Sequence, residues 1–206
     1  MSIDTALQRV AAINQAISNP AALAAQTGGA SAPEAIPSPI GASGTFAATL
    51  ANASASGSSS GSGSRVVAAA ESQIGQAEQP PGSNESPAIA EYRAATAGAA
   101  PGAPWCAYFA SWAARQAGTP LGAQGEGLGS VSAIWSWAQS SGRAVANGPG
   151  VVPKPGDLIV FGDQHVGIVK GVLPDGSIQT IEGNYENKVS LNVRPAGEAS
   201  GYVSMS

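Results

Sequence analysis

The chain contains a single cysteine, Cys106, and a single histidine, His165, and both occur where a thiol hydrolase would need them. Cys106 follows Pro104-Trp105 and opens the apolar segment CAYFASWAARQAG, which predicts a helix ending near Gly118. His165 lies in the strand-like segment FGDQHVGIVKGV. A thiol paired with an imidazole from another element is the arrangement of Cys-His nucleophilic catalysis, and a lone cysteine predicts no disulfide framework.

The segment IEGNY at 181–185 adds two polar residues, Glu182 and Asn184. If one strand continues through both, their side chains share a face of the sheet. Either could then accept a hydrogen bond from one ring nitrogen of His165 and leave the other nitrogen for the thiol. Asp163, two residues before the histidine, is the weaker candidate for this role because it lies in a predicted turn.

Each of these residues also has a purely structural explanation. A lone cysteine is often an inert core residue, and a histidine on a strand can be satisfied by ordinary hydrogen bonds. Position favours chemistry, because the first amides of a helix lack intrahelical acceptors and stabilise an anion such as a thiolate. We expect Trp105 to line a groove, Gly167 to leave open space beside the imidazole, and the remaining aromatic residues of the helix, Tyr108, Phe109 and Trp112, to anchor it in the core.

Charge and aromatic residues divide the 206-residue chain unevenly. No Lys or Arg occurs between Arg9 and Arg65, and ten of the eleven aromatic residues follow residue 90. The sequence therefore predicts one domain over 65–206, a flexible Gly/Ser linker over 54–64, and a helical, low-complexity segment over 1–53.

Within the predicted domain, helical patterns come first and strand patterns follow. Helices are predicted over 65–75, 86–98, 106–117 and 129–142, with Ser86 as one N-cap and Ser130 or Ser132 as another. The segments DLIVF, HVGIVKGV, SIQTIEG and KVSLNVR are β-rich and separated by turn residues. Helices followed by an antiparallel meander indicate an α+β fold.

Composition excludes several classes of function. The net charge of −4 comes without a basic cluster, so the sequence predicts no nucleic-acid binding. It also predicts no membrane-spanning helix and no cleaved secretory signal at the N-terminus. One cysteine and one histidine cannot form a zinc site without several carboxylates, and no phosphate-binding glycine motif occurs. We therefore expect neither a metal nor a cofactor.

Three segments together resemble a known family. PWCAYFASWAARQAG, GDLIVFGDQHVGIVKGV and IEGNYEN are similar, in order and spacing, to the three blocks of the CHAP domain, the cysteine- and histidine-dependent amidohydrolase/peptidase family of peptidoglycan hydrolases. The upstream segment ESQIGQAEQPPGSNESPAIAEYRAATAG also resembles the family's leading helices and loop. The resemblance extends from residue 65 to about 203.

The resemblance implies a papain-like fold, with helices packed on an antiparallel sheet and the nucleophile at a helix start. By position, Cys106 would be the nucleophile, His165 the general base and then acid, Glu182 the residue that orients the imidazole, and Asn184 a further polar residue of the site. Some members carry a calcium loop before the cysteine, but AGAAPGAP occupies that place here. The Cys106 amide is the expected first oxyanion donor, and Tyr92 is a candidate for the second.

The expected function is cleavage of an amide bond in peptidoglycan, by an amidase or an endopeptidase. Residues 1–53 resemble N-terminal parts of flagellar rod or wall-remodelling proteins, which suggests flagellar rod or export machinery as a partner and export to the cell wall, periplasm or outside without a cleaved signal. A phage endolysin would share the chemistry. The alternative is an inactive CHAP-like protein that binds the wall or serves flagellar assembly.

Overall fold

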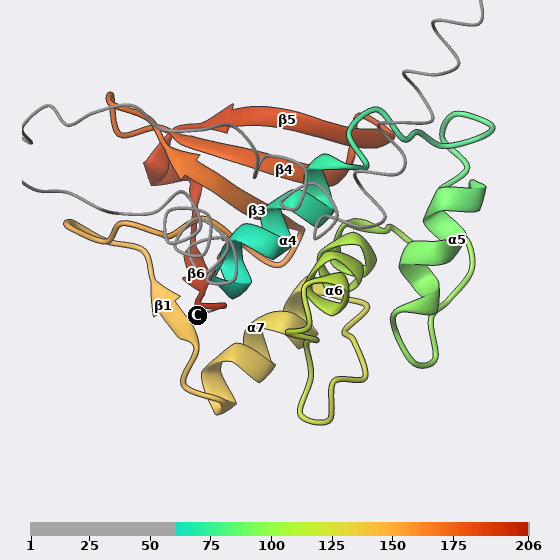
Figure 1. The fold of residues 1–206 in the computed structure, drawn as a ribbon, viewed down its shortest axis with the longest axis horizontal. Coiled ribbons are helices and arrows are strands. Elements are labelled where there is room, and N and C mark those ends of the chain that lie inside the picture. Colours follow the sequence, from blue (N-terminus) through green and yellow to red (C-terminus); the bar gives the residue numbers. More distant parts are fainter. Residues whose placement is uncertain (1–60, 206) are drawn as a thin grey trace, which may run out of the picture. The chain divides into compact units, whose positions relative to one another are not determined.

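The computed structural model of the chain describes residues 61–205, so the predicted segment 1–53 and most of the predicted linker lie outside the described residues. Four α-helices precede a six-stranded antiparallel sheet within the described part, which confirms the predicted α+β class (Figure 1). The elements are α4 (Ser62–Glu71), α5 (Pro87–Ala94), α6 (Cys106–Gln116), α7 (Val131–Ser140), β1 (Ala144–Ala146), β2 (Leu158–Phe161), β3 (His165–Val172), β4 (Ile178–Tyr185), β5 (Lys188–Arg194), a 3₁₀ turn (Ala196–Glu198) and β6 (Gly201–Val203).

The sheet has the strand order β1-β6-β2-β3-β4-β5. Strands β2 to β5 form the predicted meander, each pairing with the next along the chain. The last strand, β6, instead crosses back and pairs with both β1 and β2. Strands β1 and β6 have three residues each, and the sequence did not predict them.

Local sequence signals explain where the helices begin. The Ser86 side chain accepts a hydrogen bond from the Ile89 amide at 3.2 Å, and Pro87 follows it at the first helical position. Of the two candidate caps for α7, Ser130 accepts from the Ala133 amide at 3.2 Å. Such caps satisfy amides that the helix itself leaves without acceptors.

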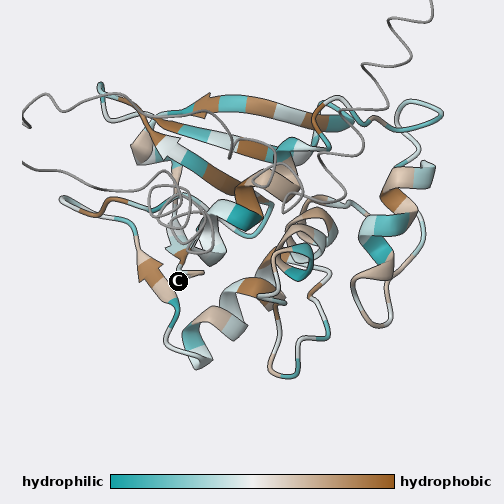
Figure 2. Ribbon diagram, viewed as in Figure 1, coloured by the Kyte–Doolittle hydropathy of each residue, from teal (hydrophilic) through white to brown (hydrophobic). Residues whose placement is uncertain are grey.

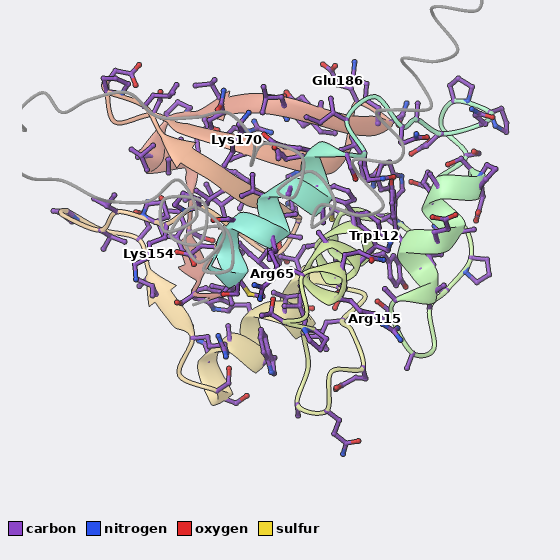
Figure 3. All side chains as sticks on the ribbon, in the orientation of Figure 1. Arg65, Trp112, Arg115, Lys154, Lys170 and Glu186 are labelled. Atoms are coloured by element: carbon purple, nitrogen blue, oxygen red, sulfur yellow. The ribbon has the colours of Figure 1, made fainter. Side chains whose placement is uncertain are left out.

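Helix α4 begins at Ser62, three residues earlier than its sequence indicated. The Ser62 hydroxyl donates to the Met205 carbonyl at 2.9 Å, so contact with the end of the chain extends the helix. In Figure 3 the Arg65 side chain lies between α4 and α6, and its Nε donates to the Ala117 carbonyl at 3.0 Å. On the other side, Lys170 of β3 pairs with Glu71 at 2.8 Å.

The main core lies between the helices and one face of the sheet. Helix α6 is buried over most of its length, and its rings pack against the α5 side chain Tyr92, whose centroid lies 5.2 Å from that of Phe109 and 5.1 Å from that of Trp112. Outer strand β5 alternates apolar and polar residues along its ribbon (Figure 2). The helix thus sits at the centre of the described domain, with its first residue facing β3 and β4.

A glycine on β4 permits the close approach of α6 to the sheet. A Cβ atom added at Gly183 would lie 2.6 Å from the Phe109 Cβ, which is closer than side chains can pack. Because the Phe109 Cβ moves only with the helix backbone, relief of this clash requires α6 to shift. Gly183 therefore sets the distance between the start of α6 and the strands that carry His165 and Glu182.

We expect Gly183→Ala to lower the free energy of unfolding by about 1–3 kcal/mol, the usual cost of overpacking a core. Urea denaturation followed by tryptophan fluorescence measures this change. Gly171→Ala is the matched control, because an added Cβ there meets no atom within 4 Å. It should change stability by no more than about 0.5 kcal/mol. Equal effects of the two substitutions would contradict the steric argument.

Candidate active site

Cys106 is the first residue of α6, with Trp105 at the N-cap. No side chain caps this end of the helix, so the amides of its first turn have no side-chain acceptor. Unpaired amides and the helix dipole make the position favourable for negative charge on the sulfur or on a bound oxygen. The residue is buried, with 5% of its surface exposed.

His165 begins β3 and meets Glu182 from the neighbouring strand β4. The imidazole Nε2 lies 2.8 Å from Glu182 Oε2. An ionised carboxylate can only accept, so Nε2 carries the proton and donates it, and Nδ1 is left as the nitrogen that can serve the thiol. The His165 side chain is 20% exposed and the Glu182 side chain is fully buried.

Cys106 and Glu182 both raise the pKa of the His165 imidazole. Burial alone would lower the pKa of His165, but hydrogen bonds with the Cys106 thiol and the Glu182 carboxylate, together with their negative charges, outweigh it. They raise the pKa of His165 from 6.5 to about 9. The structure therefore brings together three of the residues singled out in the sequence, from α6, β3 and β4.

The carboxylate of Glu182 receives hydrogen bonds from three residues. Arg194 donates twice, from Nε to Oε1 at 2.9 Å and from Nη2 to Oε2 at 2.7 Å, and the Thr180 hydroxyl donates to Oε1 at 2.6 Å. Burial would raise the pKa of Glu182, but the hydrogen bonds from Arg194, His165 and Thr180 lower it to about 2. Arg194 was not predicted from the sequence, because an arginine at the end of an edge strand carries no local signal of function.

The other two candidates lie apart from this network. Asn184 lies within an irregular stretch of the pairing between β4 and β5 and has a left-handed backbone with φ of 61°. Its side chain has no hydrogen bond to any residue within 61–205, and its role in the site stays a prediction. Asp163 lies in the exposed turn between β2 and β3, and the imidazole bonds Glu182 instead.

Three expectations about the surroundings of the site were wrong. Trp105 lines no groove: it is fully buried, and its indole N–H donates to the buried Glu78 carboxylate at 2.9 Å. The Tyr92 hydroxyl is no oxyanion donor, since it donates to Gln73 Oε1 at 2.9 Å within the core. The space beside Gly167 is filled, because a Cβ added there would lie 2.8 Å from the Glu182 Cγ.

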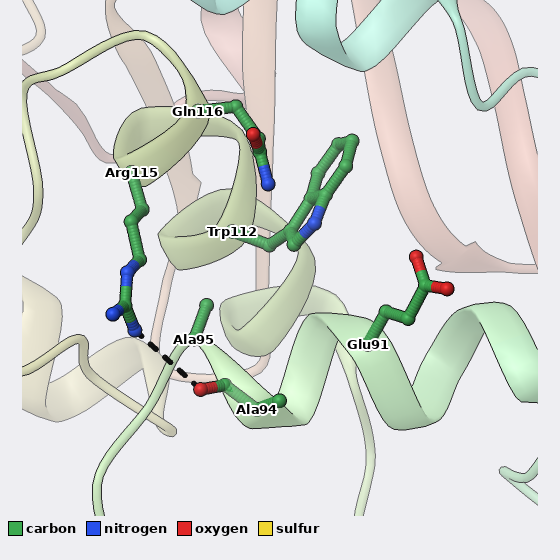
Figure 4. Close-up of a pocket in the computed structure, with 6 residues that line it drawn as sticks. All are labelled: Glu91, Ala94, Ala95, Trp112, Arg115 and Gln116. Atoms are coloured by element: carbon green, nitrogen blue, oxygen red, sulfur yellow. Dashed lines mark hydrogen bonds between the residues drawn. The ribbon is translucent and has the colours of Figure 1, made fainter.

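Two pockets of the described domain are lined by different elements. One of about 320 Å³ lies between α5 and α6, where Arg115 donates to the Ala94 carbonyl at 3.5 Å, and Figure 4 shows that the candidate site residues are not among its lining. The other, of about 400 Å³, adjoins the turn that precedes His165. It is lined by Ser132, Trp135 and Ser136 of α7, by Gly162 and Asp163 of the turn, and by Ser200.

Within residues 61–205, no group of three or more His, Cys, Asp or Glu side chains could hold a metal ion. None of the helices in this range has the length and apolar character needed to cross a bilayer.

Comparison with known families agrees with this geometry. The model of the CHAP domain matches residues 98–184, a range that contains Cys106, His165 and Glu182. Residues 98–184 thus match the CHAP domain that the motifs predicted, and this family consists in general of hydrolases that act on peptidoglycan. Neither the curated proteins nor the solved structures gave a match.

Because His165 is the only histidine in the chain, its titration can be followed directly by NMR of the imidazole protons. We expect an apparent pKa near 9, above the ordinary 6.5. In Cys106→Ala the pKa should fall, since one hydrogen bond and one negative charge that favour the imidazolium are lost. A wild-type pKa at or below 6.5, unchanged in the variant, would contradict the contact between thiol and imidazole.

Proposed function

We propose that this protein is a cysteine amidohydrolase that cleaves an amide bond in the peptide part of peptidoglycan. The observation that supports it best is the position of His165, which hydrogen-bonds Glu182 at 2.8 Å through Nε2 and also hydrogen-bonds the sulfur of Cys106. A nucleophile, its base and the residue that orients the base form the minimum set for acyl transfer by a thiol. The CHAP match supplies the class of substrate.

The Cys106 sulfur reacts as its thiolate, with the proton held on His165 as the imidazolium. The sulfur attacks the amide carbonyl and forms a C–S bond. As the C–N bond breaks, the His165 imidazolium gives its proton to the departing amine. The neutral imidazole then takes a proton from water, the resulting oxygen nucleophile attacks the thioester, and release of the sulfur restores the thiolate and imidazolium.

The negative oxygen of the tetrahedral intermediate requires donors near the sulfur. The backbone N–H of Cys106 is the first, because it belongs to the uncapped first turn of α6. The predicted polar residue Asn184 remains a proposed member of the site. Its side chain is half-buried and uncommitted within the described residues, so it is free to contact substrate next to Glu182.

The pocket beside the hairpin turn suggests where the substrate extends. Trp135 offers an indole face, and the hydroxyls of Ser132 and Ser136 lie one helical turn apart on the same side of α7. An aromatic surface edged with hydroxyls suits the sugar and peptide groups of a muropeptide. Its position next to the turn leading into His165 favours a binding cleft that continues from the site.

The biological setting is proposed from sequence alone. Peptidoglycan lies outside the cytoplasm, so the protein would act in the wall, the periplasm or outside the cell. Residues 1–53 and the Gly/Ser linker would tether or deliver the domain, and flagellar rod or export machinery is the proposed partner for that segment. Phage lysis would require the same chemistry.

An inactive wall-binding protein is the second candidate, and the low exposure of Cys106 is the observation that favours it. The two functions differ in whether reagents can reach the sulfur of Cys106. An enzyme must let a small electrophile reach the sulfur, whereas a structural thiol stays unlabelled. Co-sedimentation with sacculi, without release of soluble fragments, would support the binding protein.

We expect the purified chain to clear suspensions of sacculi, and both Cys106→Ala and His165→Ala to reduce the rate by at least about a thousandfold. Mass spectrometry of the released muropeptides decides the bond: a free lactyl group on the sugar indicates an amidase, and shortened stem peptides indicate an endopeptidase. Gly171→Ala, where an added Cβ meets no atom within 4 Å, is the folded control and should retain most of the activity. Clearing by Cys106→Ala at the wild-type rate would refute the proposed nucleophile.

A further inference from the structure

The buried carboxylate of Glu182 is held mainly by one side chain that the motifs of the chain do not include. Of its four hydrogen bonds, two come from the guanidinium of Arg194, one from Thr180 and one from His165. Arg194 touches both carboxylate oxygens, at 2.9 Å and 2.7 Å. A bidentate pair of this kind fixes the plane of the carboxylate as well as its position.

Arg194 is itself fixed by its neighbours. Its guanidinium carbon lies 4.6 Å from the centroid of the Tyr185 ring and 5.2 Å from that of Phe161, and its Nη1 lies 3.7 Å from Glu198. The same two rings adjoin His165, at centroid distances of 5.8 Å for Phe161 and 6.4 Å for Tyr185. Phe161 and Tyr185 thus contact both the imidazole and the guanidinium, and the Glu182 carboxylate is hydrogen-bonded to both groups.

The chemistry explains why such a partner is needed. A buried carboxylate that faces only an imidazolium can take its proton, or rotate and lose the hydrogen bond. Arginine cannot give up its charge in this range of pH, and its planar group matches the carboxylate. Lysine would supply the charge through a single flexible point, without fixing the plane.

We infer that Arg194 is a positioning residue that keeps Glu182 ionised and correctly oriented, so that His165 presents Nε2–H to the carboxylate and Nδ1 to the Cys106 sulfur. This inference rests on the proposed function only in taking Cys106 as the reactive nucleophile. It adds a fourth member to the network, contributed by edge strand β5, outside the residues that match the CHAP model.

The charged groups around this network are few. Cys106 faces the imidazole from α6, and Arg194 faces the carboxylate from β5. Tyr185 and Glu198 contact Arg194 from its outer side, and Thr180, which does not titrate, completes the set on β4. Removal of Arg194 therefore leaves Glu182 with Thr180 and His165 as its only donors among the described residues.

The test measures the rate at which iodoacetamide alkylates Cys106, from pH 3 to pH 10. Since Cys106 is the only thiol in the chain, the full-length protein reports on this site alone. The alkylation rate falls as the pH is lowered. In Arg194→Met we expect this fall to occur about one pH unit higher than in wild type, because Glu182 takes a proton at higher pH and then no longer stabilises the imidazolium. At a pH on that decline the rate should fall about tenfold.

Three further variants separate positioning from general packing. Arg194→Lys keeps the charge and should give a profile between those of wild type and Arg194→Met. Thr180→Val removes one neutral hydrogen bond and should shift the profile by less than about half a pH unit. Arg143→Met is the control, because Arg143 also lies over an aromatic ring, that of Trp137, and donates a hydrogen bond to a backbone carbonyl. It contacts none of the site residues, so its removal should leave the pH profile unchanged. Thermal melts identify any variant that fails to fold.

A cooperatively folded Arg194→Met or Arg194→Lys with the wild-type profile would overturn the inference and leave Arg194 a structural residue. A wild-type thiol that shows no acidic decline would overturn it together with the proposed nucleophile. If the profiles shift as expected but no variant or wild type releases muropeptides from sacculi, the proposed substrate is wrong and the role of Arg194 stands.

Discussion

The buried carboxylate of Glu182 determines the arrangement around it, because a fully buried anion must be met by donors from every open side. Arg194 and Thr180 satisfy three of its hydrogen bonds, and the fourth is left for His165. Once this bond is made, the ring of His165 has a single orientation, with Nδ1 turned away from the carboxylate. The position of one acid on β4 thereby fixes which nitrogen can meet the sulfur of Cys106.

Two glycines make room for this arrangement on neighbouring strands. A side chain at Gly167 of β3 would displace the Glu182 Cγ, and one at Gly183 of β4 would push Phe109 and its helix away from the sheet. The first glycine therefore lets the carboxylate lie against β3, and the second lets α6 approach β4. Together they place the start of the helix within reach of the imidazole, so the network depends on missing side chains as much as on those present.

Features that depend on neighbouring residues could be predicted from the sequence, whereas features that depend on contacts between distant residues could not. Ser86, Ser130 and the start of α6 at Cys106 were predictable, because caps and apolar spacing are local. The short strands β1 and β6 are defined by pairing with strands distant in the sequence. A segment of three residues is too short to show the alternation of apolar and polar residues that predicts a strand. Trp105 was misassigned because its partner Glu78 precedes it by 27 residues and lies in a loop. Arg194 likewise has meaning only once β5 pairs with β4.

The energetics of the network argue for chemistry over stability. Burying a carboxylate with an arginine and an imidazole seldom stabilises a fold more than apolar side chains of similar volume would, because the desolvation of the ions offsets their attraction. A purely structural domain would gain little stability from a buried carboxylate, an arginine and an imidazole placed beside its only thiol. It would gain no stability from leaving the amides at the start of α6 without a cap. A thiol hydrolase needs both, since the network holds the imidazole and the uncapped amides receive negative charge. The low exposure of Cys106 is compatible with this reading, because a nucleophile needs an opening only as wide as the reacting carbonyl.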